Sequence, residues 1–278
     1  MTLAHPAYGQ LRQVTPTAAV LLANNPGTMT LDGTNTWILR APGHSEFVVV
    51  DPGPRDRAHQ QAVASLGPVA LTLITHRHDD HTGGLKRHVM LTGSQVRSLD
   101  PKFLHSSMHP LHDGEIIDAA GLQIRVLATP GHTGDSVSFV LSDAVLTGDT
   151  ILGAGTSVLD SRDGRLEDYL ASLRKLVVLG AGRRLLPAHG PDRDDTAAEA
   201  RDYIAHRMGR LEQIRDALAY LGQDAGPTKI VAHVYRNVDK KLWPAARSSV
   251  KAQLEYLRAH PELNTPVQSE GPLKPWRD

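Results

Sequence analysis

Cysteine is absent from this chain of 278 residues. Its absence excludes disulfide bonds and thiolate metal ligands, so imidazole and carboxylate groups would have to hold any metal ion. Histidine occurs 15 times and Asp plus Glu 30 times, so ligands of this kind are plentiful. The search for a functional site therefore begins where histidine and aspartate cluster.

Long apolar runs are missing as well. No stretch approaches the roughly 18 residues that a membrane-spanning helix needs. The first 13 residues have neither the basic start nor the apolar centre of an export signal, and residues 17–23 are too short and too weakly apolar to serve as one. We therefore expect a cytoplasmic protein that does not contact a membrane.

Net charge is also absent, because 30 Lys and Arg balance 30 Asp and Glu. Overall charge thus gives no strong argument for nucleic acid as a partner. The distribution is less even, since residues 227–278 carry 9 basic and 5 acidic side chains while residues 1–226 carry 21 and 25. The C-terminal part could present a basic face to a polyanion, or it could simply be a solvated helix surface.

The order of apolar segments predicts an α/β protein with a large first domain and a small second one. Strands are expected at residues 14–23, 37–39, 47–50, 69–75, 115–117, 122–128, 137–141, 144–146 and 185–186, with short strands or connectors at 90–91 and 95–97. Helices are expected at residues 55–66, 85–89, 166–179, 196–221, 228–235 and 243–257. A polar connector at 191–195 separates the predicted domains 1–195 and 196–278, and a terminal β element is expected within 265–276.

The helix predicted at residues 196–221 carries an apolar stripe that we expect to pack in a core. The stripe consists of Ala200, Ile204, Met208, Leu211, Ile214, Leu218 and Leu221.

The densest cluster of candidate metal ligands follows the apolar run 69–75 and spells H-x-H-x-D-H. His76 and His78 are two residues apart in an extended segment, so both side chains can point to the same side and bind one ion. A following turn would bring Asp80 and His81 to a second ion. We expect Gly83 and Gly84 to supply the freedom that this turn needs.

Three further segments complete a pattern that resembles the metallo-β-lactamase superfamily of hydrolases. They are Pro130-Gly131-His132-Thr133, Leu146-Thr147-Gly148-Asp149-Thr150 and Leu186-Pro187-Ala188-His189-Gly190, and each follows an apolar run. The resemblance implies that His76, His78 and His132 hold one metal ion. It also implies that Asp80, His81 and His189 hold a second ion and that Asp149 bridges the two. Solvated loop histidines that happen to cluster are the alternative interpretation.

The resemblance extends to the β-lactamase-like protein 2 subfamily. It rests on Asn25-Pro26-Gly27, on residues 30–36 and 151–158, and on the C-terminal segments 203–207 and 254–258. It implies a four-layer αββα sandwich of two mixed sheets, followed by a C-terminal helical, winged-helix-like domain. The segment from Asp160 to Gly164 departs from the subfamily pattern as a small insertion and could reshape the rim of the pocket.

Two cations a few ångströms apart can lower the pKa of a shared water and supply a hydroxide nucleophile near neutral pH. A ligand set of His and Asp without sulfur suits Zn²⁺, so two Zn²⁺ per chain are expected, with Mn²⁺ or Fe²⁺ as alternatives. Asp80 has a second candidate role, which is to orient or deprotonate the attacking water. No oligomeric state is predicted.

Asp51 and Thr133 are candidates for residues that contact the metal ligands without binding a metal ion themselves. Asp51 ends a predicted strand, where its carboxylate could fix the tautomer of a ligand imidazole. A turn carboxylate before Pro52 is the alternative for Asp51, and a capping hydroxyl is the alternative for Thr133.

Other features are interpreted more simply. His105, His109 and His112 lie in a Pro-containing loop without a carboxylate pattern, so we expect surface histidines, with a position at the pocket rim as the alternative. Residues 153–155 form a glycine turn rather than a phosphate loop. Trp276 lies near Lys274 and Arg277 and could stack on a base, although packing is the simpler expectation.

The leading functional hypothesis from the sequence is hydrolysis of phosphodiester bonds in single-stranded RNA, as an endoribonuclease. Its support is the resemblance over almost the whole chain and the basic C-terminal part. Hydrolysis of a small-molecule thioester or ester, as in glyoxalase-II-like relatives, is the main alternative. A β-lactamase, a mononuclear iron sulfur dioxygenase and a nucleic-acid-binding module with structural metals are the remaining alternatives.

Overall fold

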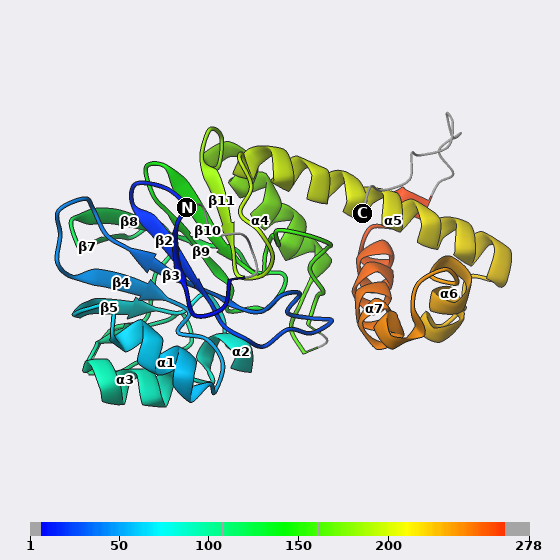
Figure 1. Cartoon of the computed structure of the whole chain (residues 1–278). Helices are drawn as coiled ribbons and strands as arrows, with labels where there is room; N and C mark the ends of the chain where they lie inside the picture. Colours follow the sequence, from blue (N-terminus) through cyan, green and yellow to red (C-terminus); the bar gives the residue numbers. More distant parts are fainter. Residues whose placement is uncertain (1–6, 107, 161, 265–278) are drawn as a thin grey trace.

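The computed structural model describes residues 7–106, 108–160 and 162–264, and it stacks two β-sheets between two layers of helices (Figure 1). This is the predicted four-layer arrangement, which is confirmed. A helical C-terminal part lies beside the layers, as Figure 1 shows on the right. In the described ranges, no helix combines the length and the apolar character that crossing a membrane requires.

The first sheet has six strands in the order of the chain, from β1 to β6. They are β1 (Leu11–Gln13), β2 (Ala18–Leu22), β3 (Asn35–Leu39), β4 (Phe47–Val50), β5 (Val69–Leu73) and β6 (Val96–Arg97). The first four strands pair antiparallel, and β4–β5 and β5–β6 pair parallel. Parallel pairs need crossover connections, and here these contain α1 (Arg57–Ala64), α2 (Asp79–Thr82) and α3 (Leu85–Thr92).

The second sheet has five strands in the order β11-β10-β9-β8-β7. They are β7 (Ile116–Ala119), β8 (Leu122–Ala128), β9 (Val137–Val140), β10 (Ala144–Gly148) and β11 (Arg184–Pro187). Strands β7 to β10 pair antiparallel, and β10 pairs parallel with β11 through the crossover helix α4 (Leu166–Leu179). Both sheets are therefore mixed.

Apolar residues from the two sheets face one another and form the central core. Trp37, Val50 and Leu73 of the first sheet contribute to it, as do Phe139 and Leu146 of the second. Its members alternate along the strands, because successive side chains point to opposite faces. The other face of the first sheet packs on α1, and the other face of the second packs on α4.

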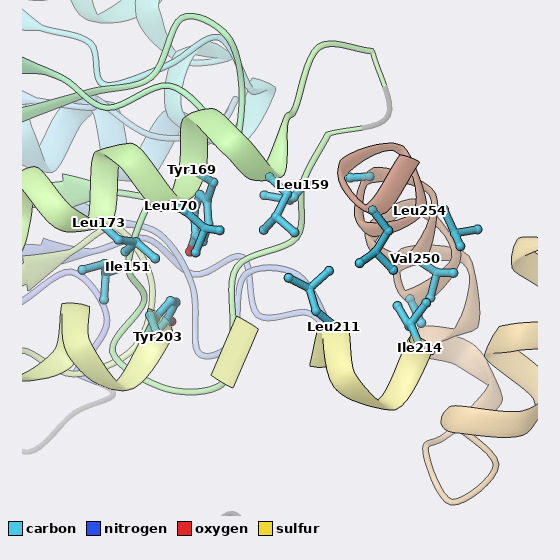
Figure 2. Packing of buried hydrophobic residues seen from close by; sticks show 14 of the residues in the cluster. Ile151, Leu159, Tyr169, Leu170, Leu173, Tyr203, Leu211, Ile214, Val250 and Leu254 are labelled. Carbon is cyan, nitrogen blue, oxygen red and sulfur yellow. The ribbon is translucent and has the colours of Figure 1, made fainter. Parts of the chain in front are cut away.

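The C-terminal part consists of α5 (Thr196–Leu221), α6 (Pro227–Val234), the short 3₁₀ helix η2 (Lys240–Leu242), α7 (Trp243–Ala259) and the 3₁₀ helix η3 (Pro261–Asn264). Figure 2 shows Tyr169 and Leu173 of α4 near Tyr203 of α5, and Val250 of α7 near Ile214 farther along α5. These residues belong to one apolar cluster. The same core thus runs from the second sheet into the C-terminal helices, and the domain boundary at 195 stays a prediction.

Most predicted elements that fall on the described residues occur in the structure, and two details differ. The 14–23 segment is not one strand, because residues 14–17 form the hairpin turn that contains Pro16 and joins β1 to β2. Residues 90–91 are not a strand, because α3 continues through them to Thr92 and ends at Gly93, which adopts a left-handed conformation. The β element expected within 265–276 lies outside the described residues.

Met208 is exposed rather than packed in the stripe of α5, while its neighbour Arg207 is buried. Arg207 donates a hydrogen bond to the carbonyl of Ser157, and its guanidinium lies 4.9 Å from the ring centroid of Tyr169. At this turn of α5, hydropathy alone places the buried position one residue too far along the helix, whereas Ala200, Leu211, Ile214 and Leu218 are buried as predicted.

Candidate metal centre

Seven side chains converge at one edge of the two sheets. The first segment follows β5 and supplies His76 and His78 before α2, and Asp80 and His81 on α2 itself. Three more candidate ligands follow strands of the second sheet, namely His132 after β8, Asp149 after β10 and His189 after β11. Their candidate ligand atoms form two groups, and within each group all atoms lie within 4.8 Å of one another.

The first cluster contains His76, His78, His132 and Asp149. Nδ1 of His78 lies 3.0 Å from Nε2 of His76 and 3.1 Å from Nε2 of His132. Two nitrogens bound to one tetrahedral Zn²⁺ would lie about 3.3 Å apart, given Zn–N distances of 2.0–2.1 Å. The separations are therefore close to those of a metal-bound triad.

The second cluster contains Asp80, His81 and His189. Oδ2 of Asp80 lies 3.1 Å from Nε2 of His189 and 3.3 Å from Nε2 of His81. Both imidazoles are buried, whereas a quarter of the Asp80 side chain stays accessible. Asp80 is therefore the member of this cluster that reaches toward solvent.

Asp149 divides its two carboxylate oxygens between the clusters. Oδ1 faces the second cluster, 3.3 Å from Nε2 of His189 and 3.6 Å from Nε2 of His81. Oδ2 faces the first cluster, 3.6 Å from Nε2 of His132 and 3.9 Å from Nε2 of His76. This is the arrangement of a carboxylate that can bridge two cations.

The outward-facing ring nitrogens of the histidines each meet an oxygen acceptor. His81 donates from Nδ1 to Asp51 at 2.7 Å, His189 donates from Nδ1 to the carbonyl of Gly33 at 2.9 Å, and His78 donates from Nε2 to Asp160 at 3.0 Å. His132 donates from Nδ1 to the carbonyl of Val158. Such contacts fix the orientation of each ring and, in the neutral imidazole, leave the other nitrogen without a hydrogen.

The ring nitrogens and carboxylate oxygens that face into the two clusters could bind cations, because each offers a lone pair. Bare nitrogens that face one another repel unless a positive charge lies between them. Nε2 of His81 and Oδ1 of Asp149 are buried and have no hydrogen-bond partner among the described residues. The two His/Asp clusters are therefore consistent with a dinuclear metal site.

Asp51 lies behind both clusters and is almost completely buried. Besides His81, it accepts hydrogen bonds from the amide nitrogen and the hydroxyl of Thr75, at 2.8 and 2.6 Å. The hydroxyl of Thr75 in turn lies 3.1 Å from Nδ1 of His76. Asp51 has a φ of 53°, a region that costs a non-glycine residue about 1–3 kcal/mol. Asp51 thus contacts a candidate ligand of the second cluster directly and one of the first cluster through Thr75.

Within the described residues, the Thr133 side chain does not support a candidate metal ligand and instead lies within a turn. Its hydroxyl is 2.7 Å from that of Ser136, and its carbonyl accepts a hydrogen bond from the amide of Gly131. These contacts close the turn that carries His132. This geometry corresponds to the capping alternative for Thr133.

The electrostatics differ between the two clusters. Burial and the neighbouring imidazoles keep the pKa of His76 well below 6.5, and burial lowers the pKa of His132 to about 4. Burial alone would also lower the pKa of His81 and His189, but nearby carboxylates outweigh it. Asp80, Asp51 and Asp149 raise the pKa of His81, and Asp149 with Asp80 raises that of His189 to about 10.

Glycines matter at this edge mainly because they let segments approach closely. Gly83 and Gly84 have ordinary helical φ values of −61° and −79°, so the predicted need for conformational freedom is wrong. A Cβ on Gly84 would instead overlap the side chain of Gln60 and the carbonyl of Pro54. Gly148 does need freedom, because its φ is +51° and a Cβ would meet the Cβ of Thr75 at 2.8 Å.

The sequence did not identify every residue that supports the clusters. The carbonyls of Gly33 and Val158 cannot be recognised from side-chain patterns, because every residue carries a carbonyl. The sequence marks Asp160 only as the start of an insertion, yet its carboxylate accepts a hydrogen bond from His78. Its one sequence signal was its place in a segment that departs from the family pattern.

The other candidate features lie outside the clusters. His105, His109 and His112 are exposed, as expected of surface histidines. The glycine turn at 153–155 lies under α5, where the hydroxyl of Tyr203 donates a hydrogen bond to the carbonyl of Gly155 at 3.0 Å. Trp276 lies outside the described residues.

A cavity of about 360 Å³ opens beside His132 and Asp149. Its walls come from the loop after β10 and from the C-terminal helices. Apolar residues predominate on them, including Leu31, Leu152, Val158, Val238, Leu242 and Ala246. His206, Arg207 and Arg210 of α5 supply its basic groups.

Comparison with known proteins identifies two matching family models. Residues 29–89 match the model described as the metallo-β-lactamase superfamily, and residues 227–260 match the β-lactamase associated winged helix domain. The first match contains the H-x-H-x-D-H segment, and the second contains α6 and α7. The C-terminal part is therefore a winged-helix domain of the type found with this hydrolase fold.

Individual relatives cover most of the chain. The β-lactamase-like protein 2 homolog of Drosophila melanogaster is 30% identical over 277 residues, covering 90% of this chain and 91% of that protein. The atrochrysone carboxyl ACP thioesterase of Aspergillus fumigatus is 32% identical over 223 residues, covering 77% of this chain and 68% of that protein. Both alignments are long enough to contain the hydrolase layers.

Solved structures show the same architecture. A β-lactamase domain protein from Burkholderia ambifaria superimposes with a TM-score of 0.78 at 19% identity, covering 93% of this chain and 91% of that one. A metallo-β-lactamase family protein from Thermus thermophilus superimposes with a TM-score of 0.71 at 24% identity, covering 89% and 95%. At these identities the likeness concerns the fold alone.

Proposed function

This chain belongs to the metallo-β-lactamase superfamily, and on that premise we propose that it is a metal-dependent hydrolase that cleaves an acyl thioester or ester. The observation that carries the proposal is the division of the Asp149 carboxylate between two ligand clusters, beside an apolar cavity. The first feature fits hydrolysis with two cations. The second favours a substrate with an apolar part.

Two Zn²⁺ per chain are the proposed metals. His76, His78 and His132 would hold one ion, Asp80, His81 and His189 would hold the other, and Asp149 would contact both. Nitrogen and oxygen ligands without sulfur suit Zn²⁺, and Mn²⁺ or Fe²⁺ are the alternatives. Two bound divalent cations lower the pKa of a shared water and polarise the carbonyl under attack.

The protein's own groups prepare the site for that chemistry. Asp51, Asp160 and the carbonyls of Val158 and Gly33 orient the imidazoles before a substrate arrives. Preorganised groups of this kind need no rearrangement during the reaction. Asp80 is the partly accessible carboxylate, so it can orient the attacking water or accept its proton.

The apolar cavity favours an acyl substrate over a phosphodiester. Leu152, Val158 and Leu242 line it, and such apolar walls suit an alkyl or aromatic acyl group. The relative from Aspergillus fumigatus, which is named as an ACP thioesterase, supports the same substrate class. The mostly apolar wall would leave several phosphate charges of a polynucleotide without partners.

Single-stranded RNA is the second candidate substrate, and a separate groove favours it. This groove of about 700 Å³ lies along α1 and α3, and Arg77 and Thr82 of the ligand segment also line it. Basic residues Arg55, Arg57, Lys86, Arg87 and Lys102 outnumber the acidic residues Asp56 and Asp79 on its walls. Basic grooves of this kind follow the backbone of single strands.

Purified protein with measured metal content should be assayed against thioesters with short and long acyl chains, labelled single-stranded RNA and nitrocefin. We expect thioester hydrolysis that a chelator abolishes and zinc restores, with a preference for the longer chains. Cleavage of RNA alone would favour the second candidate. Turnover of nitrocefin alone would identify a β-lactamase, and oxygen consumption with a single iron would identify a dioxygenase.

Two variants connect the activity to the clusters. Asp80→Asn should lower kcat by about 10²–10⁴-fold while most of the metal stays bound, because a water-orienting carboxylate is lost. His189→Ala should lose the metal of the second cluster as well. His112→Ala, which replaces an exposed histidine, is the matched control and should retain full activity. Unchanged turnover in Asp80→Asn would exclude that residue from the reaction.

A further inference from the structure

Segment 157–160 lies against two ligands of the first cluster. The carbonyl of Val158 accepts a hydrogen bond from Nδ1 of His132, and the amide of Asp160 donates one to the carbonyl of His132 at 2.8 Å. The Asp160 carboxylate, on the same segment, accepts from Nε2 of His78 at 3.0 Å. One short segment therefore contacts both histidines.

The Asp160 side chain is buried and held by cations on its other side. Only 9% of it is exposed, and Oδ2 lies 2.9 Å from Nη2 of Arg77 and 2.7 Å from Nη2 of Arg162. Arg77 also binds Asp135 at 2.9 Å and Asp163 at 2.7 Å. Because a guanidinium stays charged at every accessible pH, this arrangement keeps Asp160 ionised and in place.

The same segment is anchored to the C-terminal helices. Leu159 is buried in the shared apolar cluster, where Figure 2 shows it beside α4 and facing α7. Its carbonyl accepts a hydrogen bond from the hydroxyl of Ser248 on α7 at 2.8 Å. The position of Asp160 is therefore fixed from the core as well as from the surface.

We propose that Asp160 is a positioning residue for the first metal cluster, which holds His78 with Nε2 protonated and Nδ1 bare. The inference rests on the metal centre of the proposed function and adds a residue to it. A carboxylate acceptor fixes the orientation of the ring and raises the basicity of the opposite nitrogen. Nδ1 of His78 is the atom that lies near Nε2 of both His76 and His132.

Asp163 provides a matched comparison within the same loop. Its carboxylate binds Arg77 as Asp160 does, but it makes no hydrogen bond to His78 in the described structure. Loss of Asp163 therefore reports what the ion pairs of the loop contribute by themselves. Loss of Asp160 adds the loss of the imidazole contact and of the pair with the exposed Arg162.

The first test is metal affinity, measured by competition with a chelating dye on protein whose folding is checked by circular dichroism. We expect Asp160→Ala to bind one of two zinc ions about 10–100-fold more weakly, as for other residues that support metal ligands. Asp160→Asn retains an oxygen acceptor and should be intermediate. Asp163→Ala should stay within about threefold of the unchanged protein. Equal losses in Asp160→Ala and Asp163→Ala would overturn the proposal.

The second test needs no metal and no substrate. The ¹⁵N chemical shifts of the His78 ring report its tautomer in the metal-free protein. We expect the Nε2-protonated form in the unchanged protein and in Asp163→Ala, and a mixture of tautomers in Asp160→Ala. A His78 tautomer that does not respond to Asp160→Ala would overturn the proposal. Metal affinity that depends on Asp160 without any thioester hydrolysis would instead contradict the proposed function alone.

Discussion

The two halves of the sandwich hold their candidate metal ligands by different means. In the half built on the first sheet, the ligand segment is held by side chains, above all by Asp51 and Thr75. In the half built on the second sheet, His132 and His189 donate to backbone carbonyls, namely those of Val158 and Gly33. The first half therefore orients its candidate ligands through side-chain acceptors, and the second half orients them through backbone carbonyls.

This difference predicts unequal sensitivity to substitution. A side-chain acceptor can be removed by one mutation, and its buried partners are then left unsatisfied. A backbone carbonyl persists whatever residue carries it, so its hydrogen bond fails only when the chain itself moves. The first half also contains two buried histidines, His59 and His88, which add sensitivity to pH.

The largest effect is expected for Asp51→Ala. This change leaves the hydrogen-bond donors of Thr75 and His81 unsatisfied in a buried site, so the free energy of unfolding should fall by about 3–5 kcal/mol. Zinc affinity should fall as well. Chemical denaturation and metal titration provide the measurements. Asp118→Ala removes an exposed carboxylate and should change stability by less than about 0.5 kcal/mol. Similar results for both variants would contradict the role of Asp51.

Acid should destabilise the first half next. Burial lowers the pKa of His59 and of His88 from 6.5 to about 4. Between pH 4 and pH 6.5 the unfolded chain binds more protons than the folded chain. The stability that these neutral imidazoles contribute is therefore fully present above pH 6.5 and is lost as the pH falls toward 4. Each imidazole contributes at most about 3 kcal/mol to this loss.

Denaturation curves across this pH range measure the effect. His59→Gln and His88→Gln should each reduce the dependence on pH, whereas His112→Gln, at an exposed position, should leave it unchanged. A dependence that is undiminished in the double variant would assign the acid sensitivity to other buried groups, such as His76 and His132, whose pKa values burial also lowers.

Gly148→Ala should have the third-largest effect and involves the contact between the halves. Its φ of +51° is unfavourable for alanine, and the new Cβ would press on Thr75. Gly182 has a φ of +70°, and a Cβ added there would meet nothing within 4 Å, so this position separates strain from crowding. We expect Gly182→Ala to cost about 1 kcal/mol and Gly148→Ala about 2 kcal/mol more, as measured by thermal or chemical unfolding. Equal losses of unfolding free energy in the two variants would show that the halves can move apart at Gly148 to make room for the added Cβ.

The smallest effect is expected for Tyr169→Phe in the second half. The Tyr169 hydroxyl donates to the carbonyl of Thr150 at 2.6 Å, next to the ligand Asp149. Its loss should lower the free energy of unfolding by about 1 kcal/mol and should change zinc affinity little. Tyr220→Phe, on an exposed side chain, is the control. A large loss of zinc in Tyr169→Phe would mean that the second half also depends on single side chains.

The helices and strands that form the layers could be predicted from local sequence, because the spacing of apolar residues reflects which face of each element is buried. Helices α4 and α5 occur at their predicted bounds, since apolar residues recur at helical spacing and a glycine follows each one. The short strand or connector expected at 90–91 is wrong because two apolar residues fit a strand or a helix equally well. Only the continuation of α3 to its glycine cap decides between them.

The candidate ligands could also be predicted, because imidazoles and carboxylates at strand ends form a recognisable series. The structure brings all seven together. The groups behind them could not be predicted, because they depend on tertiary approach. Asp160 meets His78 across 82 positions of sequence, and no local pattern encodes such a contact.

Arg207 illustrates the same limit in the C-terminal part. Hydropathy assigns arginine to the surface, yet this side chain is buried between the Ser157 carbonyl and the Tyr169 ring. Its charge is tolerated because hydrogen bonding and cation–π attraction compensate for lost hydration. Both partners come from distant segments, so the sequence of α5 alone could not reveal them.

Helix α5 has a consequence for how this protein can be shortened. It is a single helix of 26 residues, about 39 Å long, and its first half covers α4 while its second half carries α6 and α7. Ending the chain at residue 195 would strip the apolar outer face of α4, including Leu173, and expose it to water. We therefore expect the shortened product to aggregate, so the minimal stably folded fragment must retain at least the beginning of α5.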